Sequence, residues 1–183
     1  MQHRSSLRAL SATAGFSLIE LMVTVTLAAV LLGIAIPSFR GLIVNNRVIT
    51  QSNELVGAIN FARSEAITRN SNIVLCRATT AASNVCALSR GDWTNWIVRN
   101  AAATPPVVRR GIVNTYSATM RVFSDLSLDS VTFSSDGLAR TGGVLVSDKV
   151  ITVCTSAASS DNVRSVTLGA GSRLSTTKST GSC

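Results

Sequence analysis

Few residues in this chain of 183 residues have side chains suited to catalysis. Its only histidine is His3, and nine Asp and Glu residues serve the whole chain. Hydrolytic and metal sites draw on histidines and clustered acids, so neither kind of site is expected. The sequence has no Gly-x-x-x-x-Gly-Lys-[Ser/Thr] phosphate loop, and Gly169 and Gly171 lack the third glycine of a dinucleotide-binding motif. We therefore predict a protein that is not an enzyme and needs no cofactor or metal.

The most informative charged residue is Glu20, the one charge in an apolar run of twenty-one residues from Phe16 to Ile36. At about 1.5 Å per residue, a helix of this length spans a hydrocarbon core of about 30 Å. An ionised carboxylate near the start of a lipid-exposed helix costs roughly 2.5–3.5 kcal/mol on insertion scales. Cleavage after Gly15 would create a compensating charge, the α-amino group of Phe16. This neutralisation could act within one chain or between neighbouring chains.

The residues around the apolar run predict its orientation. Arg4 and Arg8 precede it without any acid, so the positive-inside rule leaves the N-terminus in the cytoplasm and exports everything after Pro37. A secretory signal ends in a small-x-small cleavage site after its apolar run, whereas here the small residues come before it, ending at Gly15. Cleavage there would keep the apolar helix as a membrane anchor.

The leader carries a resemblance to a known family. The segment 15–20, Gly-Phe-Ser-Leu-Ile-Glu, resembles the class III signal of type IV prepilins and type II secretion pseudopilins. In that family a membrane prepilin peptidase cuts after the glycine, here Gly15, and N-methylates the new first residue, here Phe16. The acid, here Glu20, aligns each subunit with the N-terminus of its neighbour in the filament. The resemblance implies a leader peptide, 1–15, and a transmembrane and filament-core helix, 16–36.

The chain after Pro37 first keeps a helical pattern. We expect one helix from about Ser17 to Arg69, with a bend or a local melt at Pro37, because proline removes a backbone donor. Its second part, residues 37–70, is amphipathic and would lay an apolar stripe on the rest of the protein. The stripe consists of Val48, Leu55, Ile59, Ala62 and Ala66, while Asn53, Arg63 and Arg69 fall on other faces.

Beyond Asn70 the pattern changes to short β-branched runs, which predict strands at 73–76, 96–98, 107–108, 131–133, 150–153 and 163–168. Turn signals such as Asp136-Gly137 and Gly142-Gly143 separate them. Because no helical pattern intervenes, we expect a mainly antiparallel β-rich head at residues 71–183, folded into two layers. Its expected core anchors are Trp93, Trp96 and Phe133.

The resemblance becomes narrower in the middle of the chain. The segments 54–76, 93–98, 131–137 and 151–154 resemble the GspH/FimT/FimU group of minor pilins and pseudopilins. Together with the leader, the resemblance covers nearly the whole chain. It implies a pilin-like α+β fold, in which a long N-terminal transmembrane and amphipathic α-helix packs on an antiparallel β-rich head.

The four cysteines are Cys76, Cys86, Cys154 and Cys183. Their spacing contains no Cys-x-x-Cys pair, which argues against zinc or thioredoxin-like chemistry, and an even count in an exported domain predicts two disulfides. Three pairings can be drawn. We favour Cys76–Cys86, which closes a short Ala/Ser/Thr loop, and Cys154–Cys183, which ties a polar tail to a strand. The second closes a loop of about thirty residues and would contribute about 3–4 kcal/mol by the loop-entropy model.

The formal charge of +8 draws attention to the acid-poor C-terminal stretch, where Arg164, Arg173 and Lys178 stand amid Ser and Thr. We expect this stretch to be flexible, and such a stretch could follow a phosphate backbone with salt-sensitive affinity. DNA-binding members of the FimT branch carry a Gly-Arg-x-Arg motif near the C-terminus. Here the segment 171–174, Gly-Ser-Arg-Leu, shifts the first arginine and lacks the second. A solvated basic rim is the favoured interpretation, with DNA contact as the alternative.

We therefore predict a minor type IV pilin or related pseudopilin that, after processing by prepilin peptidase, helps initiate or cap pilus assembly. Residues 16–36 would hold it in the inner membrane as a single pass, with a cytoplasmic N-terminus and a periplasmic head, before it enters the pilus or fimbrium. Its expected partners are the peptidase, other minor and major pilins or pseudopilins, and membrane lipid. The alternatives are a DNA-binding minor pilin for natural transformation and a type II secretion system pseudopilin.

Overall fold

The computed structural model describes residues 15–101, 107–115, 119–157 and 161–183. The predicted leader, apart from Gly15, lies outside the described residues. The chain divides into two compact units, the N-terminal unit up to Phe39 and the C-terminal unit Arg40–Cys183. The long helix α1 (Leu18–Thr68) contributes residues to both units. In the rest of the described chain, strands alternate with turns and two single-turn 3-10 helices, η1 (Ser127–Asp129) and η2 (Ala170–Ser172).

The helix α1 begins and ends within one residue of the predicted bounds. Its backbone is helical from Leu18 to Thr68, so a local melt at Pro37 is wrong, and a bend there stays a prediction. A proline removes one backbone donor, and the hydrogen bonds of the turns on either side remain to continue the helix.

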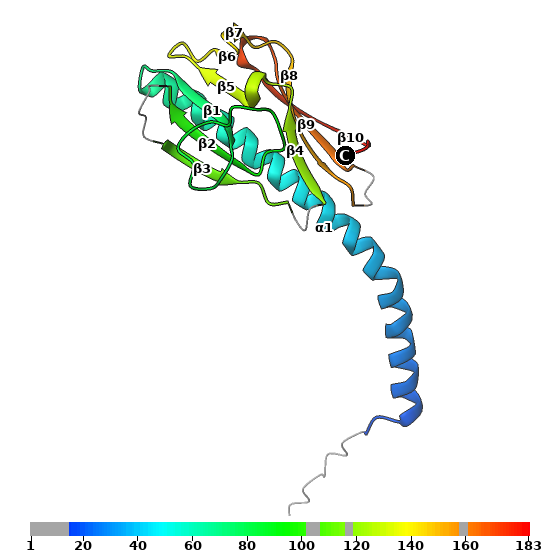
Figure 1. The fold of residues 1–183 in the computed structure, drawn as a ribbon. Helices are drawn as coiled ribbons and strands as arrows, with labels where there is room; N and C mark the ends of the chain where they lie inside the picture. The colour runs from blue at the N-terminus through cyan, green and yellow to red at the C-terminus, as the bar shows by residue number, and fades with distance from the viewer. Residues whose placement is uncertain (1–14, 102–106, 116–118, 158–160) are drawn as a thin grey trace, which may run out of the picture. The chain divides into compact units, whose positions relative to one another are not determined.

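The strands form two antiparallel sheets (Figure 1). Sheet A has the strand order β3-β2-β1-β5-β6-β7, and sheet B has the order β10-β9-β8-β4. Sheet A contains β1 (Ile73–Ala78), β2 (Asn95–Asn100), β3 (Val107–Ile112), β5 (Ser130–Phe133), β6 (Ala139–Thr141) and β7 (Val144–Leu145). Sheet B contains β4 (Met120–Ser124), β8 (Lys149–Thr155), β9 (Val163–Leu168) and β10 (Leu174–Ser179).

One hydrophobic core joins the second part of α1 to the inner faces of both sheets. The predicted stripe of α1 is confirmed, because all five of its residues are fully buried. The predicted anchors are confirmed as well, since Trp93, Trp96 and Phe133 are among the largest fully buried side chains. The exposed Arg109 of β3 holds its guanidinium carbon 5.3 Å from the Phe61 ring centre and 5.7 Å from the Trp96 ring centre. Its cation thus lies against the aromatic rings at this side of the core.

The C-terminal stretch differs from the expectation of a flexible segment. Residues Leu174–Ser179 form β10, and all six pair with β9 in antiparallel register. The repeated Ser and Thr residues are compatible with this because threonine favours extended backbone, and hydroxyl side chains tolerate an exposed edge strand. The prediction of a flexible tail is therefore wrong.

Candidate functional site

The predicted processing segment leads directly into the first turn of α1. Gly15, Phe16 and Ser17 precede the helix, and the Ser17 hydroxyl accepts a hydrogen bond from the backbone N–H of Glu20 at 3.3 Å. Ser17 and Glu20 thus supply the serine half of a capping box, a Ser-x-x-Glu signal that was present in the sequence and not used above. Glu20 also places a negative charge in the first helical turn, where the helix dipole favours it.

The first part of α1 carries an apolar exterior. Leu18–Ala35 is long and apolar enough to cross a membrane by length and composition, and all of it is exposed within its own unit. Phe16, directly before it, is 75% exposed. The hydroxyls of Thr24 and Thr26 donate to backbone carbonyls three or four residues earlier, at 2.9 Å. These polar groups are therefore satisfied inside the helix, as a hydrocarbon environment requires.

Unlike these hydroxyls, the carboxylate of Glu20 has no partner within the described part of the helix. Among the described residues, no hydrogen bond or ion pair involves its side-chain oxygens. The helix thus presents one acid without a charge partner at the start of an otherwise apolar segment. Such a group is costly in lipid until a cation approaches it.

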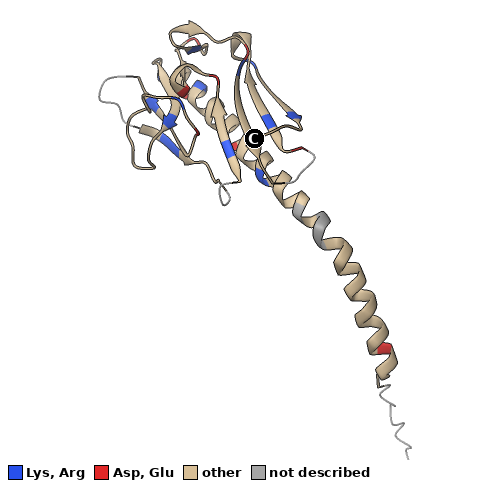
Figure 2. Ribbon diagram, turned by 45° about the vertical axis from the view of Figure 1, so that its right-hand side comes forward, with Lys and Arg blue, Asp and Glu red and all other residues tan. Residues whose placement is uncertain are grey.

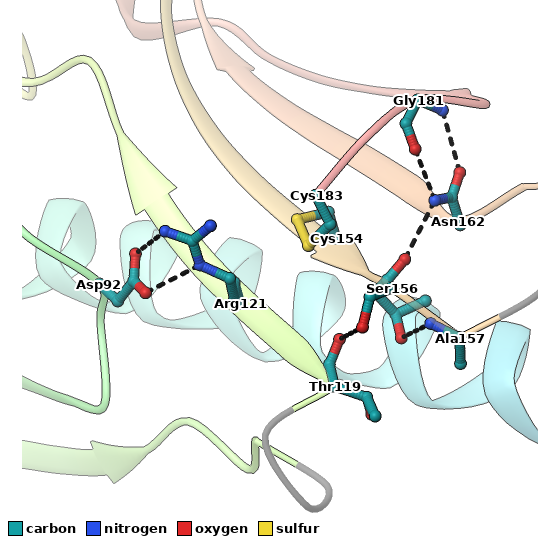
Figure 3. Close-up of a disulfide and its surroundings, with 10 residues drawn as sticks. Asp92, Thr119, Arg121, Cys154, Ser156, Ala157, Asn162, Gly181 and Cys183 are labelled. Atoms are coloured by element: carbon teal, nitrogen blue, oxygen red, sulfur yellow. Dashed lines mark hydrogen bonds and ion pairs between the residues drawn. A yellow bond between two sulfur atoms is a disulfide. The ribbon is translucent and has the colours of Figure 1, made fainter.

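Two disulfides brace the C-terminal unit. Cys76 is bonded to Cys86 and Cys154 to Cys183, with Cα–Cα distances of 5.6 Å and 5.5 Å. These are the pairs favoured by the sequence analysis. Asn162 reinforces the second one, because its side-chain amide exchanges two hydrogen bonds with the backbone of Gly181 (Figure 3). The end of the chain is therefore fixed to β8 by the disulfide and to the residue directly before β9 by the hydrogen bonds.

A bidentate ion pair lies on the surface near this disulfide. Arg121 of β4 donates to both carboxylate oxygens of Asp92, at 2.9 Å and 3.0 Å (Figure 3). The hydrogen bonds that Arg121 donates to Asp92, together with the negative charge of that carboxylate, raise the pKa of Arg121 above its ordinary value. Both side chains are about half exposed, so solvent screens their attraction and the pair has little weight in stability.

The basic residues of the C-terminal stretch do not form one cluster in the structure. Arg164 of β9 stands opposite Lys178 of β10 in the sheet register, but Lys178 is paired with Asp161 at 3.1 Å. Arg164 lies on the same face of β9 as Val166 and Leu168, because residues two apart in a strand share a face, and both of these are buried. Arg164 therefore faces the core, and its Nε is buried without a hydrogen-bond partner. Lys and Arg residues are spread over both sheets in Figure 2.

Arg173 stands apart from the other two. It follows η2 directly, at the start of β10, five residues from Lys178. Five strand residues separate the two cations by about 17 Å. It is exposed, its carbonyl accepts a hydrogen bond from the backbone N–H of Gly169 at 2.8 Å, and no hydrogen bond or ion pair of its side chain is found within the described part of the chain. The three residues therefore do not make one phosphate-binding cluster.

A buried ionic cluster was missed by the sequence analysis. The Asp129 carboxylate is buried and accepts from Arg77 Nε at 3.3 Å, from the Ser124 hydroxyl at 2.7 Å and from the Gly91 N–H at 2.7 Å. Arg77 also donates to the carbonyl of Ser89. These bonds, with the Cys76–Cys86 disulfide, fix the connection between β1 and β2. No local sequence signal links Arg77 to Asp129, which lie 52 positions apart.

No group of three or more His, Cys, Asp or Glu residues that could hold a metal ion occurs in the described ranges. The features with functional content are therefore the apolar helix with its single acid and the braced β-rich unit. An N-terminal apolar helix that continues into a core covered by antiparallel sheets defines the pilin-like α+β fold.

The comparisons with known proteins identify the family. The chain belongs to the GspH family, because the family model described as type II transport protein GspH matches residues 51–172, more than half of the chain. A prokaryotic N-terminal methylation motif matches residues 10–36, the range that contains Gly15, Phe16 and Glu20. These matches confirm the family expected from the sequence, the GspH/FimT/FimU group of pilins and pseudopilins. Members of this family are structural subunits. No curated protein sequence matches the chain.

Two crystal structures of the type IV minor pilin FimU from Pseudomonas aeruginosa, strain PAO1, resemble the structure. The form in space group P21 has 18% sequence identity and a TM-score of 0.52, and the match covers 72% of this chain and 88% of FimU. The form in space group P65 has 16% identity and a TM-score of 0.49, with 70% and 90% coverage. At this identity the likeness establishes the fold, and the P21 form is the one that carries it.

Proposed function

We propose that the chain is a minor type IV pilin that is cleaved between Gly15 and Phe16 by prepilin peptidase, is methylated on Phe16 and then helps initiate or cap pilus assembly. The proposal divides the chain into a leader, 1–15, a transmembrane and filament-core helix, 16–36, an amphipathic helix, 37–70, and a head, 71–183. The observation that carries it is the Glu20 carboxylate, which has no charge partner among the described residues of an exposed apolar helix.

Cleavage would supply the missing charge. The new α-amino group of Phe16 would be positive near neutral pH, where free α-amino groups remain largely protonated. A neighbouring subunit that brings this ammonium to Glu20 would neutralise both charges at once in a low-dielectric filament core. The exposed apolar surface of the same helix would then pack against other pilin helices, and no covalent link would be required.

Membrane insertion would precede assembly. The segment 16–36 would hold the chain in the inner membrane as a single pass, and Arg4 and Arg8 would keep the N-terminus cytoplasmic. The head would then fold in the periplasm, an oxidising compartment that permits the Cys76–Cys86 and Cys154–Cys183 disulfides. Partners at this stage would be membrane lipid and prepilin peptidase, followed by other minor and major pilins.

Mass spectrometry of the chain purified from membranes tests the processing step. We expect an N-terminal peptide that begins with methylated Phe16, and we expect it to disappear in cells without prepilin peptidase. An intact Met1 in cells that contain the peptidase would contradict the proposal.

The match to the GspH model favours a second candidate, a type II secretion pseudopilin. The same processing and helix packing would serve both functions, and only the partner subunits would differ. Deletion of the gene separates them: loss of pili with normal protein secretion supports the pilin, and loss of secretion with normal pili supports the pseudopilin.

DNA binding for natural transformation is the remaining alternative, and the contacts of the basic stretch give it little support. Lys178 is paired with Asp161, Arg164 faces the core, and Arg173 stands alone. Gel shifts of the C-terminal unit across a salt series test this function, because phosphate contacts weaken steeply as salt rises. Absence of binding at low salt would remove the DNA-binding alternative and leave the assembly role unaffected.

A further inference from the structure

The turn η1 holds two consecutive residues in the left-handed region. Leu128 has φ 52° and Asp129 has φ 49°, a conformation that residues with a Cβ atom rarely adopt. The buried bonds of Asp129 to Arg77, Ser124 and Gly91 enforce it. Leu128 is 53% exposed, so burial of its side chain does not offset the backbone strain. Strain of this kind persists where the surrounding structure imposes it, often at binding surfaces.

Leu128 lines a groove of about 550 Å³ together with Val144 and Leu145 of β7. Val144 is 70% exposed and Leu145 is 55% exposed. β7 is the outermost strand of sheet A in the strand order, and it lies with β6 at one end of the C-terminal unit (Figure 1). β7 has only two residues, so its backbone can pair with a short stretch of an extended segment, and the three exposed apolar side chains, two of them from β7 itself, offer that segment a hydrophobic contact. We call these three residues, with Arg90 and Lys149 at the rim, the β7 groove.

The rim of the β7 groove is positively charged. Arg90 donates to the carbonyl of Ser124 at 2.6 Å, and no carboxylate partner of Arg90 is found within the described chain. Lys149 lies 3.7 Å from Asp125, whose other carboxylate oxygen accepts from the backbone N–H of Val150. The groove thus carries two cations and one carboxylate.

The charge of the whole C-terminal unit restricts the occupant further. This unit contains all the Lys and Arg residues except Arg4 and Arg8 and all the Asp and Glu residues except Glu20, which leaves a formal charge of +7. A second copy of the chain would bring an equal positive charge, and like charges oppose association. The charge of the unit therefore favours a different molecule with negative charge, and the exposed apolar side chains of the groove favour one that brings an apolar side chain.

We propose that the β7 groove docks an extended acidic segment from the head of a different pilin-family subunit. An apolar side chain of that segment lies between Leu128 and Leu145, and its carboxylates meet Arg90 and Lys149. This assignment rests on the proposed function, because it takes the partner to be a neighbouring subunit of the assembly.

Photo-crosslinking of the full-length chain in its host cells tests the assignment. The probe is p-benzoylphenylalanine in place of Leu145, and the matched control is the same substitution at Ile112, an exposed apolar residue of β3 at the opposite edge of sheet A. We expect an adduct from position 145 with a pilin-family subunit whose head has a net negative charge, and no such adduct from position 112. The double variant Arg90→Glu, Lys149→Glu should lower its yield about tenfold. No adduct, an adduct with a second copy or with lipid, or a yield indifferent to charge reversal would overturn the assignment.

Leu128→Gly separates docking from folding. Glycine adopts a positive φ without strain, so the variant should unfold at the same or a higher temperature while the adduct from position 145 falls about tenfold. An unchanged adduct yield would overturn the role of Leu128. The two proposals also fail differently: an unprocessed chain contradicts the pilin function, whereas a processed chain that enters pili normally without an adduct contradicts only the β7 groove.

Discussion

Replacement of Glu20 by Gln separates membrane anchoring from subunit alignment. The change keeps the size of the side chain and removes its charge. It also removes the insertion cost of an ionised carboxylate, roughly 2.5–3.5 kcal/mol on insertion scales, so the variant should stay at least as firmly in the membrane. The local loss is the favourable position of a negative charge in the first turn of α1, about 0.3–1 kcal/mol.

The attraction that Glu20→Gln would remove between neighbouring subunits is larger than this local loss. An ammonium and a carboxylate about 4 Å apart attract each other by about 4 kcal/mol at an effective dielectric constant of 20. Since every 1.4 kcal/mol corresponds to about a tenfold change in an equilibrium constant, even half of this attraction would lower filament incorporation by more than about tenfold. We expect Glu20→Gln to be abundant in the membrane fraction and scarce in sheared pili, as measured by quantitative immunoblotting of both fractions.

The matched control is Ser17→Ala, which removes the hydroxyl that accepts the Glu20 N–H at 3.3 Å and leaves the carboxylate in place. Loss of such a cap costs about 0.5–2 kcal/mol of helix stability, so this variant should still enter pili. If Glu20→Gln enters pili normally, or if Ser17→Ala is equally defective, then Glu20 acts as a local helix residue and the alignment role is refuted.

Three further variants test the C-terminal unit. Gly111→Ala would place a Cβ 2.1 Å from two ring carbons of Trp96, so we expect it to lower the free energy of unfolding by about 1–3 kcal/mol or more; an unchanged thermal melting curve would show that the ring moves freely. Asp129→Asn should lower that free energy by about 3–5 kcal/mol in urea titrations, because it leaves Arg77 buried without its carboxylate, and a loss below about 1 kcal/mol would contradict this. Cys154→Ser should lower it by about 3–4 kcal/mol. A reducing agent breaks both disulfides of the unaltered chain, so it should lower the free energy of unfolding at least as much as Cys154→Ser does, and a smaller effect would contradict the prediction.

The helix and most strands were predictable because their signals are local. The stripe of α1 repeats at helical intervals, and β9 coincides with its predicted run of six residues. The strands β4, β6 and β7 were missed because they are short or mix polar and apolar residues, and β10 because a Ser/Thr sequence was taken for a flexible tail. Only β4 depends on a distant partner, β8, because β6, β7 and β10 each pair with the strand directly before them in the sequence.

Of the two candidate sites, the processing segment was predictable from the sequence and the β7 groove was not. Gly15, Phe16 and Glu20 form one contiguous pattern, so the sequence alone was enough to propose their roles. The β7 groove was not predictable, because Leu128 and Leu145 are brought together only by the turn at η1 and by the pairing of β6 with β7. The left-handed conformation of Leu128 follows from contacts of Asp129 with residues from other parts of the fold, which sequence spacing does not reveal.

The order of strands in the two sheets limits how the protein can be divided. The chain enters sheet A, crosses to sheet B for β4, returns to sheet A for β5 to β7 and ends in sheet B. Among the described strands, β4 has β8 as its only neighbour, so a truncation before Lys149 would leave β4 without a pairing partner and uncover one side of the core. Neither sheet can be produced alone as a recombinant fragment, and residues 40–183 are the smallest piece that we expect to survive limited proteolysis intact.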